Sequence, residues 1–289
     1  MRSKYEIVER HDLTEAEWRR LAPLLPPPAV RGRRPGDRRP ILNGILWMLA
    51  TGASWRDLPA RYPPWPTCST RTSRAGSATA PGTGSTARSS ARCARSTTPS
   101  TSSCSASTPP SSGPTRRPRA RGENVPAGEP PDHALGRSRV GFSTKLSLVT
   151  DGRGLGLAVA VHAGQASDLR AVPELLDSVC VRGRRGAPRR YPDALAGDKA
   201  YSFAPLRAWC RRHRVTAVLP RRDDQRPVRG RRFDRRRYRQ RHVIECTVGH
   251  LKEFRRIAQR ADKLAVRYRA WVVLGMVRLL LRQPFLNGA

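Results

Sequence analysis

The sequence predicts an α/β fold preceded by a small all-α domain, and three observations support this prediction. In residues 1–65, apolar side chains recur at helical spacing between capping signals. In residues 123–289, alternating apolar runs typical of strands are interleaved with helical patterns. Residues 66–122 separate these two regions and carry neither pattern. We therefore expect a helical module, a low-complexity segment and a mixed sheet flanked by helices, in that order.

The charge of the chain favours a polyanionic partner. Its 289 residues include 56 Lys and Arg against 22 Asp and Glu, which gives a formal net charge of +34 and a pI near 11.7. Nucleic acid, bound through its phosphates, is the simplest such partner. A G+C-rich genome also raises the Arg content, so charge alone does not decide the partner.

The cysteines and apolar runs predict a cytoplasmic protein. The six cysteines form no C-x-x-C pair and have no histidines at zinc-ligand spacing, so we interpret them as reduced thiols. No apolar run follows Met1, and we expect no signal peptide. The apolar stretch 271–281 is interrupted by Gly275 and Arg278 and is too short to span a bilayer. We expect it to form a buried terminal helix, and we expect no membrane partner.

A first helix is indicated early in the chain. Thr14 and Glu17 have the spacing of a capping box, in which each side chain bonds the backbone N–H of the other residue. Leu13 and Trp18 occupy the two positions of a hydrophobic staple. The run Pro26–Pro28 cannot continue a helix, so we expect the helix to end before it.

Two further helices are expected in the same module. The second has Pro40 near its first turn and ends at Gly52. Its apolar side consists of Ile41, Leu42, Ile45, Leu46 and Leu49. The third begins at Ser54, which pairs with Asp57 in a second capping box. Three short helices with a basic link are typical of helix-turn-helix modules that dock on DNA, and also of small helical caps without a ligand.

Residues 66–122 differ in composition from the rest of the chain. No Leu, Ile, Val, Met, Phe, Trp or Tyr occurs between Trp65 and Val125, and no acid occurs before Glu123. Such a segment buries too little apolar surface to offset its chain entropy, so as written it is predicted to be disordered.

The remainder of the chain alternates strands and helices. Strands over 143–150 and 155–161, joined by the turn Asp151-Gly152-Arg153-Gly154, predict a β-hairpin. The elements expected after it are a helix over 168–179, a strand over 193–198, a helix over 203–212, a strand over 215–219, a basic loop over 221–237 and two final helices. Asp198 closes one of these strands, and ligands of open α/β sheets bind at strand carboxyl ends. An acid in this position is also a common helix N-cap.

The stretch around Glu245 is the most informative part of the sequence. Apolar residues at three- and four-residue steps predict an amphipathic helix; they are Ile244, Val248, Leu251, Phe254 and Ala258. A second face carries Tyr238, Arg241, Glu245 and Lys252. This arrangement suits a metal beside a polyphosphate chain, because the carboxylate can ligate the cation while Arg and Lys neutralise phosphate oxygens. The alternative is a solvated face with intrahelical ion pairs.

The spacing Tyr-x2-Arg-x3-Glu-x6-Lys over 238–252 resembles the signature of bacterial insertion-sequence transposases of the DDE type, and all four of its positions are filled. The stretches Asp198-Lys199-Ala200-Tyr201 and 262–268 are also similar to that family. In the N-terminal module, Leu-Thr-Glu-Ala-Glu-Trp and Thr-Gly-Ala-Ser-Trp-Arg-Asp-Leu-Pro resemble the corresponding module of the same transposases. The resemblance covers most of residues 10–66 and 122–283 and fails between them.

The resemblance implies an RNase H-like core behind an N-terminal DNA-binding domain. Such an enzyme cuts DNA at the ends of a mobile element and joins the freed 3′ hydroxyl to a target. By position, Asp198 and Glu245 match the second and third metal-ligating acids of the catalytic triad. Arg241 and Lys252 match the cations that hold DNA phosphate, and Tyr238 matches the aromatic of the signature, whose role we cannot derive from the sequence. The resemblance also implies two divalent ions, normally Mg²⁺, and double-stranded DNA bound by a homodimer.

The first acid of that triad is missing from the sequence. In the family it lies on a strand of the type Val-Asp-Ser-Thr-Val-Val. Suppose that such a run, followed by Arg-Ala-His, is encoded by codons that end in C or G. Translation that starts one nucleotide late then gives Ser-Thr-Pro-Pro-Ser-Ser-Gly-Pro-Thr, which is the sequence of residues 107–115. We hypothesise a shifted frame, restored near Arg121, in which the aspartate due near Ser107 or Thr108 is lost. Asp132 and Asp151 are the nearest acids, but neither lies inside an apolar strand.

Three functions follow from these patterns. The first is a catalytically active transposase, and the second is a non-catalytic DNA-binding remnant of one. The third is an unrelated basic protein associated with RNA or the ribosome, for which the signature spacing is a coincidence. Both of the first two bind DNA with a steep salt dependence, but only the active enzyme nicks it with Mg²⁺.

Overall fold

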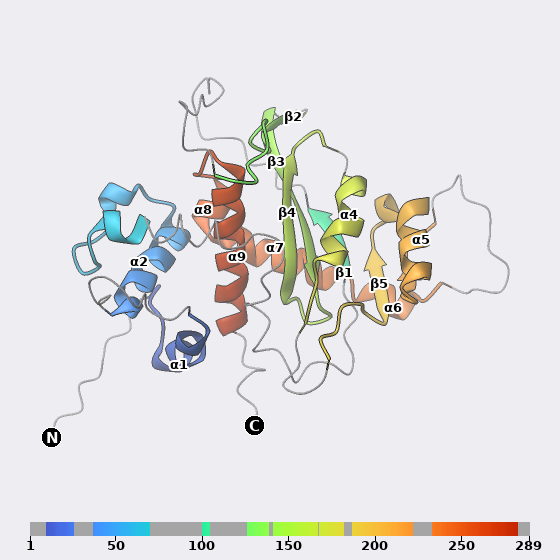
Figure 1. Cartoon of the computed structure of the whole chain (residues 1–289), viewed down its shortest axis with the longest axis horizontal. Helices are drawn as coiled ribbons and strands as arrows, with labels where there is room; N and C mark the ends of the chain where they lie inside the picture. Colours follow the sequence, from blue (N-terminus) through green and yellow to red (C-terminus); the bar gives the residue numbers. More distant parts are fainter. Residues whose placement is uncertain are drawn as a thin grey trace.

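The computed structural model describes residues 10–25, 37–69, 100–104, 126–138, 141–166, 168–181, 187–221 and 233–282. Within these residues a mixed β-sheet is flanked by helices, with the N-terminal helices at one end of the molecule (Figure 1). The predicted α/β class is therefore confirmed. The predicted helix end at Pro26–Pro28 and the place of the missing aspartate, near Ser107 or Thr108, lie outside the described residues.

The sheet is built around strand β1. Five of its strands follow the order β4-β3-β1-β5-β6, and the short β2 also pairs with β3. The strands are β1 Ser100–Cys104, β2 Gly136–Ser138, β3 Gly141–Thr150, β4 Gly156–Ala163, β5 Ala194–Gly197 and β6 Thr216–Val218. β3 is antiparallel to both β1 and β4, whereas β5 is parallel to both β1 and β6. β1 is thus the strand at which the direction of pairing changes.

The position of β1 differs from the sequence-based expectation. Its residues, Ser100–Cys104, lie within 66–122, where composition predicts no regular structure. All five pair with β3, and Ser100 and Thr101 also pair with β5. Backbone hydrogen bonds to two neighbouring strands satisfy the donors and acceptors of a segment whose sequence offers no large apolar side chain. Residues 70–99 and 105–125 lie outside the described residues.

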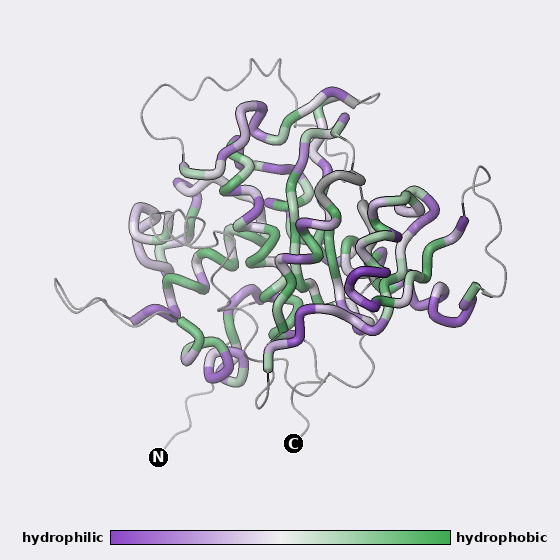
Figure 2. The backbone as a smooth tube through the Cα atoms, turned by 45° about the vertical axis from the view of Figure 1, so that its right-hand side comes forward, coloured by the Kyte–Doolittle hydropathy of each residue, from purple (hydrophilic) through white to green (hydrophobic). Residues whose placement is uncertain are grey.

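Helices cover both faces of the sheet, and side chains alternate along the strands accordingly. On β3, Leu146 and Leu148 belong to one hydrophobic core and Val149 to the other. The first core is formed with α7 (His242–Glu253), α8 (Arg255–Ala258) and α9 (Ala265–Arg282). The second is formed with α4 (Asp168–Asp177) and α5 (Ala204–Arg212). Figure 2 shows the resulting concentration of hydrophobic segments in the interior.

The predicted hairpin between β3 and β4 is confirmed. Its turn is held by the carboxylate of Asp151, which accepts the backbone N–H groups of Arg153 and Leu155, each at 2.9 Å. Gly154 adopts a φ of +84°, which a residue with a side chain rarely takes. Its carbonyl accepts a 2.9 Å hydrogen bond from the Thr247 hydroxyl, so the hairpin turn is attached to α7.

The first two N-terminal helices begin at their predicted signals, and the second also ends at its predicted stop, whereas the α-helical part of the first ends at Leu21, before Pro26–Pro28. In α1 (Glu15–Leu21) both bonds of the capping box form, since the Thr14 N–H donates to Glu17 at 2.9 Å and the Glu17 N–H donates to Thr14 at 3.2 Å. α2 (Arg38–Thr51) ends at Gly52, whose φ is +67°. Both capping assignments are confirmed.

The prediction of a third helix beginning at Ser54 is wrong. Ser54 instead caps a single 3-10 turn, η2 (Trp55–Asp57), and its hydroxyl accepts the N–H of Arg56 rather than that of Asp57. Leu58 is extended because it precedes a proline, and proline disfavours helical backbone in the preceding residue. Helical structure resumes only over 65–69.

The N-terminal helices share one core with the C-terminal helices. Residues of α1 and α2 belong to the same apolar cluster as those of α7, α8 and α9. Arg256 lies at the junction with a side chain 6% exposed: it donates to Asp262 at 2.9 Å and to the Ala53 carbonyl at 3.2 Å. Its guanidinium also lies over the rings of Trp55 and Trp271, 5.6 and 4.6 Å from their centroids. The module is therefore packed onto the core.

A buried ion pair adds to this junction. Arg278 on α9 donates to the Glu17 carboxylate on α1 at 2.8 Å, and these side chains are only 6% and 10% exposed. Arg278 also donates to the carbonyl of Asp12 at 3.1 Å. Arg278, the charged residue that interrupts the apolar stretch 271–281, thus connects the C-terminal helix α9 to the N-terminal helix α1.

The single long helix expected around Glu245 is broken in two places. The basic loop expected over 221–237 ends in a short helix, α6 (Arg235–Arg239), and α7 begins only at His242. Phe254 then adopts an extended conformation between α7 and α8. This bend places Ile257, rather than the predicted Ala258, in the core. No helix within the described residues is long and apolar enough to cross a membrane.

Replacing Glu17 with Gln should destabilise the protein strongly, because Arg278 would keep a buried charge without a counterion. We expect a loss of about 3–5 kcal/mol in the free energy of unfolding, measured by urea denaturation. The matched control is Glu15→Gln, which removes exposed pairs with Arg19 and Arg39 and should cost about 0.2–1 kcal/mol per pair. Equal losses in the two variants would contradict a structural role for the buried pair.

Candidate active site

Asp198 lies where the sequence predicts it, directly after β5. It caps the 3-10 turn η3 (Lys199–Tyr201), and its carboxylate accepts the Lys199 N–H at 2.5 Å. The side chain is exposed, whereas Tyr201 beneath the turn is only 1% exposed. The buried tyrosine therefore anchors the turn and holds Asp198 at the surface. The N-cap role that the sequence left open is present in the structure.

β1 runs beside this strand end. Thr101 pairs with Gly197 in parallel register, so the next position on β1, Ser102, follows alongside Asp198. The sequence of β1 is Ser-Thr-Ser-Ser-Cys and contains no acid. The neighbouring strand therefore supplies no second carboxylate at this edge.

Glu245 lies in the first turn of α7 and is paired with an arginine. Arg241, which precedes the helix, contacts the Glu245 carboxylate at 2.8 Å. The Glu245 side chain is 55% exposed and that of Arg241 is 22% exposed. The ion-pair alternative is therefore realised in the structure, but a pair this accessible to water contributes little to stability.

Tyr238 has a structural position that the sequence did not reveal. It lies on α6 and packs against Ala194, Ala196 and Val218, which belong to β5 and β6. The guanidinium of Arg241 lies over its ring, 5.6 Å from the centroid. The tyrosine therefore connects the strand that ends at Asp198 to the arginine that pairs with Glu245.

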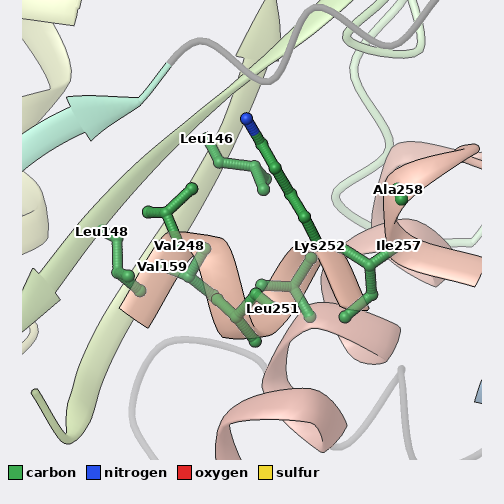
Figure 3. Close-up of a pocket in the computed structure, with 9 residues that line it drawn as sticks. Leu146, Leu148, Val159, Val248, Leu251, Lys252, Ile257 and Ala258 are labelled. Atoms are coloured by element: carbon green, nitrogen blue, oxygen red, sulfur yellow. The ribbon is translucent and has the colours of Figure 1, made fainter. Parts of the chain in front are cut away.

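Lys252 shares a face of α7 with Glu245. Seven residues amount to almost two full turns, which places the two side chains about 10 Å apart along the helix. The aliphatic part of Lys252 lines a small apolar pocket with Leu146 and Leu251, and its amine lies at the far end of the extended side chain (Figure 3). The lysine thus buries its stem and presents its charge away from the core.

These contacts join some of the predicted site residues but not all. Tyr238, Arg241 and Glu245 form one chain of contacts, and Lys252 lies further along the same face of α7. Asp198 follows the strand on which Tyr238 packs. No contact recorded within the described residues joins its carboxylate to that of Glu245. Sequence reasoning also missed α6, whose only local signal was the N-cap Asp234, which accepts the Arg237 N–H at 2.9 Å.

The site contains ligands of the type that a divalent cation prefers, but fewer carboxylates than a two-metal site needs. Carboxylate oxygens are the ligands that Mg²⁺ prefers, so Asp198 and Glu245 suit such an ion. Across the described ranges, however, no group of three or more His, Cys, Asp or Glu side chains is placed to hold a metal. Together with the absence of an acid on β1, this leaves a two-metal site incomplete.

The two other acids considered from the sequence have structural roles. Asp151 holds the hairpin turn, and burial raises the pKa of its carboxyl group above the ordinary value. Asp132 accepts the backbone N–H of Ala134 at 2.9 Å in a turn before β2. Neither replaces the missing acid.

Two protein-family models match the chain. Residues 13–79 match a family described as "Putative transposase of IS4/5 family", and residues 113–280 match the family described as "Transposase DDE domain". The interval 80–112, which neither match covers, lies within the segment 66–122 where the resemblance fails, although the two matches extend into both edges of that segment. The DDE family implies dependence on a divalent metal.

Two curated proteins are also similar to the chain. A protein of Brucella ovis named "Putative transposase for insertion sequence element IS6501" is 31% identical over 145 residues, which is 49% of this chain and 100% of that protein. The "Insertion element IS402 uncharacterized 16.2 kDa protein" of Burkholderia cepacia is 52% identical over 48 residues, 15% of this chain and 33% of that protein. The chain thus spans about a third of one relative and all of the other. No solved structure matches it.

Replacing Tyr238 with Ala should detach α6 from the sheet, because the ring supplies its packing against β5 and β6. We expect faster hydrogen exchange of the backbone amides of 235–239 and a stability loss of about 1–3 kcal/mol, less than for a fully buried aromatic because the residue is only half-buried. Tyr238→Phe keeps the ring and should leave both quantities nearly unchanged. If the Phe variant exchanged as fast as the Ala variant, the hydroxyl rather than the packing would be essential.

Proposed function

This chain belongs to the DDE-type transposases of insertion sequences, and on that premise we propose that it binds double-stranded DNA at the ends of its element and at the target, with Asp198 and Glu245 as two acids of its cleavage site. The observation that carries this proposal is the attachment of Tyr238 to β5 on one side and to Arg241 and Glu245 on the other. This packing ties the helix of the third acid to the strand of the second.

The core is proposed to be RNase H-like. The strand order β4-β3-β1-β5-β6, with antiparallel pairs on one side of β1 and parallel pairs on the other, supports this assignment. The position of Asp198 at the carboxyl end of β5 supports it further, since open α/β sheets bind ligands at such ends.

Arg241 and Lys252 are proposed to hold DNA phosphates beside these acids. In the structure Arg241 is paired with the partly exposed Glu245. A phosphate that attracts the guanidinium would weaken this pair and leave the carboxylate available to a cation. Lys252 brings a second cation to the same face of α7, and its stem is already held by the apolar pocket. The role of Arg241 is thus to neutralise Glu245 until DNA is bound.

Mg²⁺ is the proposed metal, and two ions are proposed for a site with a third acid. When bound, the ions would activate the attacking water or hydroxyl and stabilise the leaving oxygen. The residues of this chain do not complete such a site, since β1 carries no acid. The hypothesis of a shifted reading frame before Arg121 accounts for this loss and for the interval 80–112 that neither family model covers.

The N-terminal module is proposed to contact DNA in a fixed orientation relative to the core. Arg256 and the buried Glu17–Arg278 pair lock it to α8 and α9. A module held in this way would set a constant separation between the DNA it contacts and the edge of the sheet at Asp198. A homodimer on DNA and a cytoplasmic location are parts of the same proposal.

A second candidate function is a DNA-binding remnant without catalysis. The lack of a third acid among the described residues favours it for the chain as written. It keeps the positive charge, the module and the signature residues, and it loses only the chemical step.

Repair of the reading frame is the sharpest test of these alternatives. The repaired chain should nick a supercoiled plasmid carrying the element ends in Mg²⁺, and its Glu245→Gln variant should lose at least about 100-fold in rate, because a metal ligand is removed. The chain as written should bind the same DNA and show no nicking above that of the Glu245→Gln variant. Cleavage by the written chain would refute the remnant, whereas a repaired chain that binds DNA and never cuts it would refute the assignment of Asp198 and Glu245.

A further inference from the structure

The short helix α6 presents three arginines on one face. Arg235, Arg236 and Arg239 are all exposed. At 3.6 residues per turn they span an arc of about 100°. Within the described residues their side chains make no hydrogen bond or ion pair. The fourth arginine, Arg237, lies outside this arc and is paired with Asp234 at 3.4 Å. We call Arg235, Arg236 and Arg239 the arginine face of α6.

The side of α6 next to this face, which carries Tyr238, is anchored to the protein. Tyr238 packs on Ala194, Ala196 and Val218, and its ring lies 5.1 Å from that of Phe233. The exposed arginine face is therefore held in a fixed position relative to β5 and β6. Arg241, two residues after the helix, reaches Glu245 at 2.8 Å. The face is thus connected through the packing of Tyr238 to the strand of Asp198, and through Arg241 to the helix of Glu245.

Such an arrangement is unfavourable by itself. Like charges four residues apart destabilise a helix by a few tenths of a kcal/mol, and a helix of five residues is marginal in water without tertiary support. No acid in the described chain neutralises the three guanidinium groups. A bound polyanion would remove this repulsion, and guanidinium groups are well suited to phosphate oxygens.

We propose that the arginine face of α6 grips the phosphate backbone of double-stranded DNA beside the candidate active site. This inference rests on the proposed function, because it concerns the same DNA. It adds a contact surface outside the Tyr-Arg-Glu-Lys signature and gives α6 a role of holding the duplex against the edge of the sheet. The contacts go to phosphate, so they contribute affinity without sequence preference.

The test compares two sets of three arginines. Arg235, Arg236 and Arg239 are replaced together with Gln, and the matched control replaces Arg211, Arg212 and Arg214, which are also exposed and unpaired within the described chain. The control arginines lie at the end of α5, which packs on Leu195. The ring of Tyr238 packs on Ala194 and Ala196, so α5 and α6 cover opposite faces of β5. Both triple variants remove the same charge.

Binding to a duplex of about 25 base pairs is measured by fluorescence anisotropy without Mg²⁺ from 50 to 200 mM salt. The α6 variant should reduce the slope of log K against log salt by about 2.7, since each phosphate contact contributes about 0.9. The control should change it by less than about 1. Replacing the α6 arginines with Lys should retain most of the slope, because Lys preserves the charge.

Each outcome separates this inference from the proposed function. If the unaltered chain binds DNA and the two Gln variants lose the same slope, the arginine face is not a DNA contact, and the proposed function is unaffected. If the unaltered chain binds no DNA, the proposed function itself fails. A loss confined to the α6 variant, with unchanged circular dichroism, supports the inference.

Discussion

The packing of one aromatic ring is the contact on which the candidate site depends. Tyr238 lies between the strands β5 and β6 and the guanidinium of Arg241, which pairs with Glu245. The helix of Glu245 also packs against β1 and β3 in the core, but Tyr238 adds the contact that connects the strand ending at Asp198 to the arginine beside Glu245. The tyrosine of the signature is thus explained by apolar packing and a cation–π contact, before any contact with DNA is considered.

A second constraint joins the ends of the chain. The apolar sides of α1 and α2 and those of α7, α8 and α9 form one core, and Arg256 fills their junction. Buried charges are retained there only because each has a partner: Arg256 has Asp262, and Arg278 has Glu17. The protein therefore behaves physically as one body in which helices that precede the sheet in sequence pack against helices that follow it.

The weakest part of the site is also the centre of the sheet. β1 is held by backbone pairing with β3 and β5, but its sequence contains no large apolar side chain and no carboxylate. A strand in this position, beside Asp198, is where an acid would be useful for binding a cation. The unusual composition of 66–122 thus removes a possible metal ligand from the site, whereas the pairing of β1 with β3 and β5 is still formed.

The sequence alone determined the local elements: the capping box at Thr14, the end of α2 at Gly52, the hairpin turn at Asp151 and the placement of Asp198 after a strand, because these depend on neighbouring residues. It also revealed the signature from Tyr238 to Lys252. Tertiary structure decided what depends on distant residues. It broke the long helix at Arg241 and Phe254, reduced the third N-terminal helix to one turn, and placed β1 within a segment that composition predicts to be unstructured. Pairing and burial between segments far apart in the chain outweigh local propensity, and no periodicity within a short window records them.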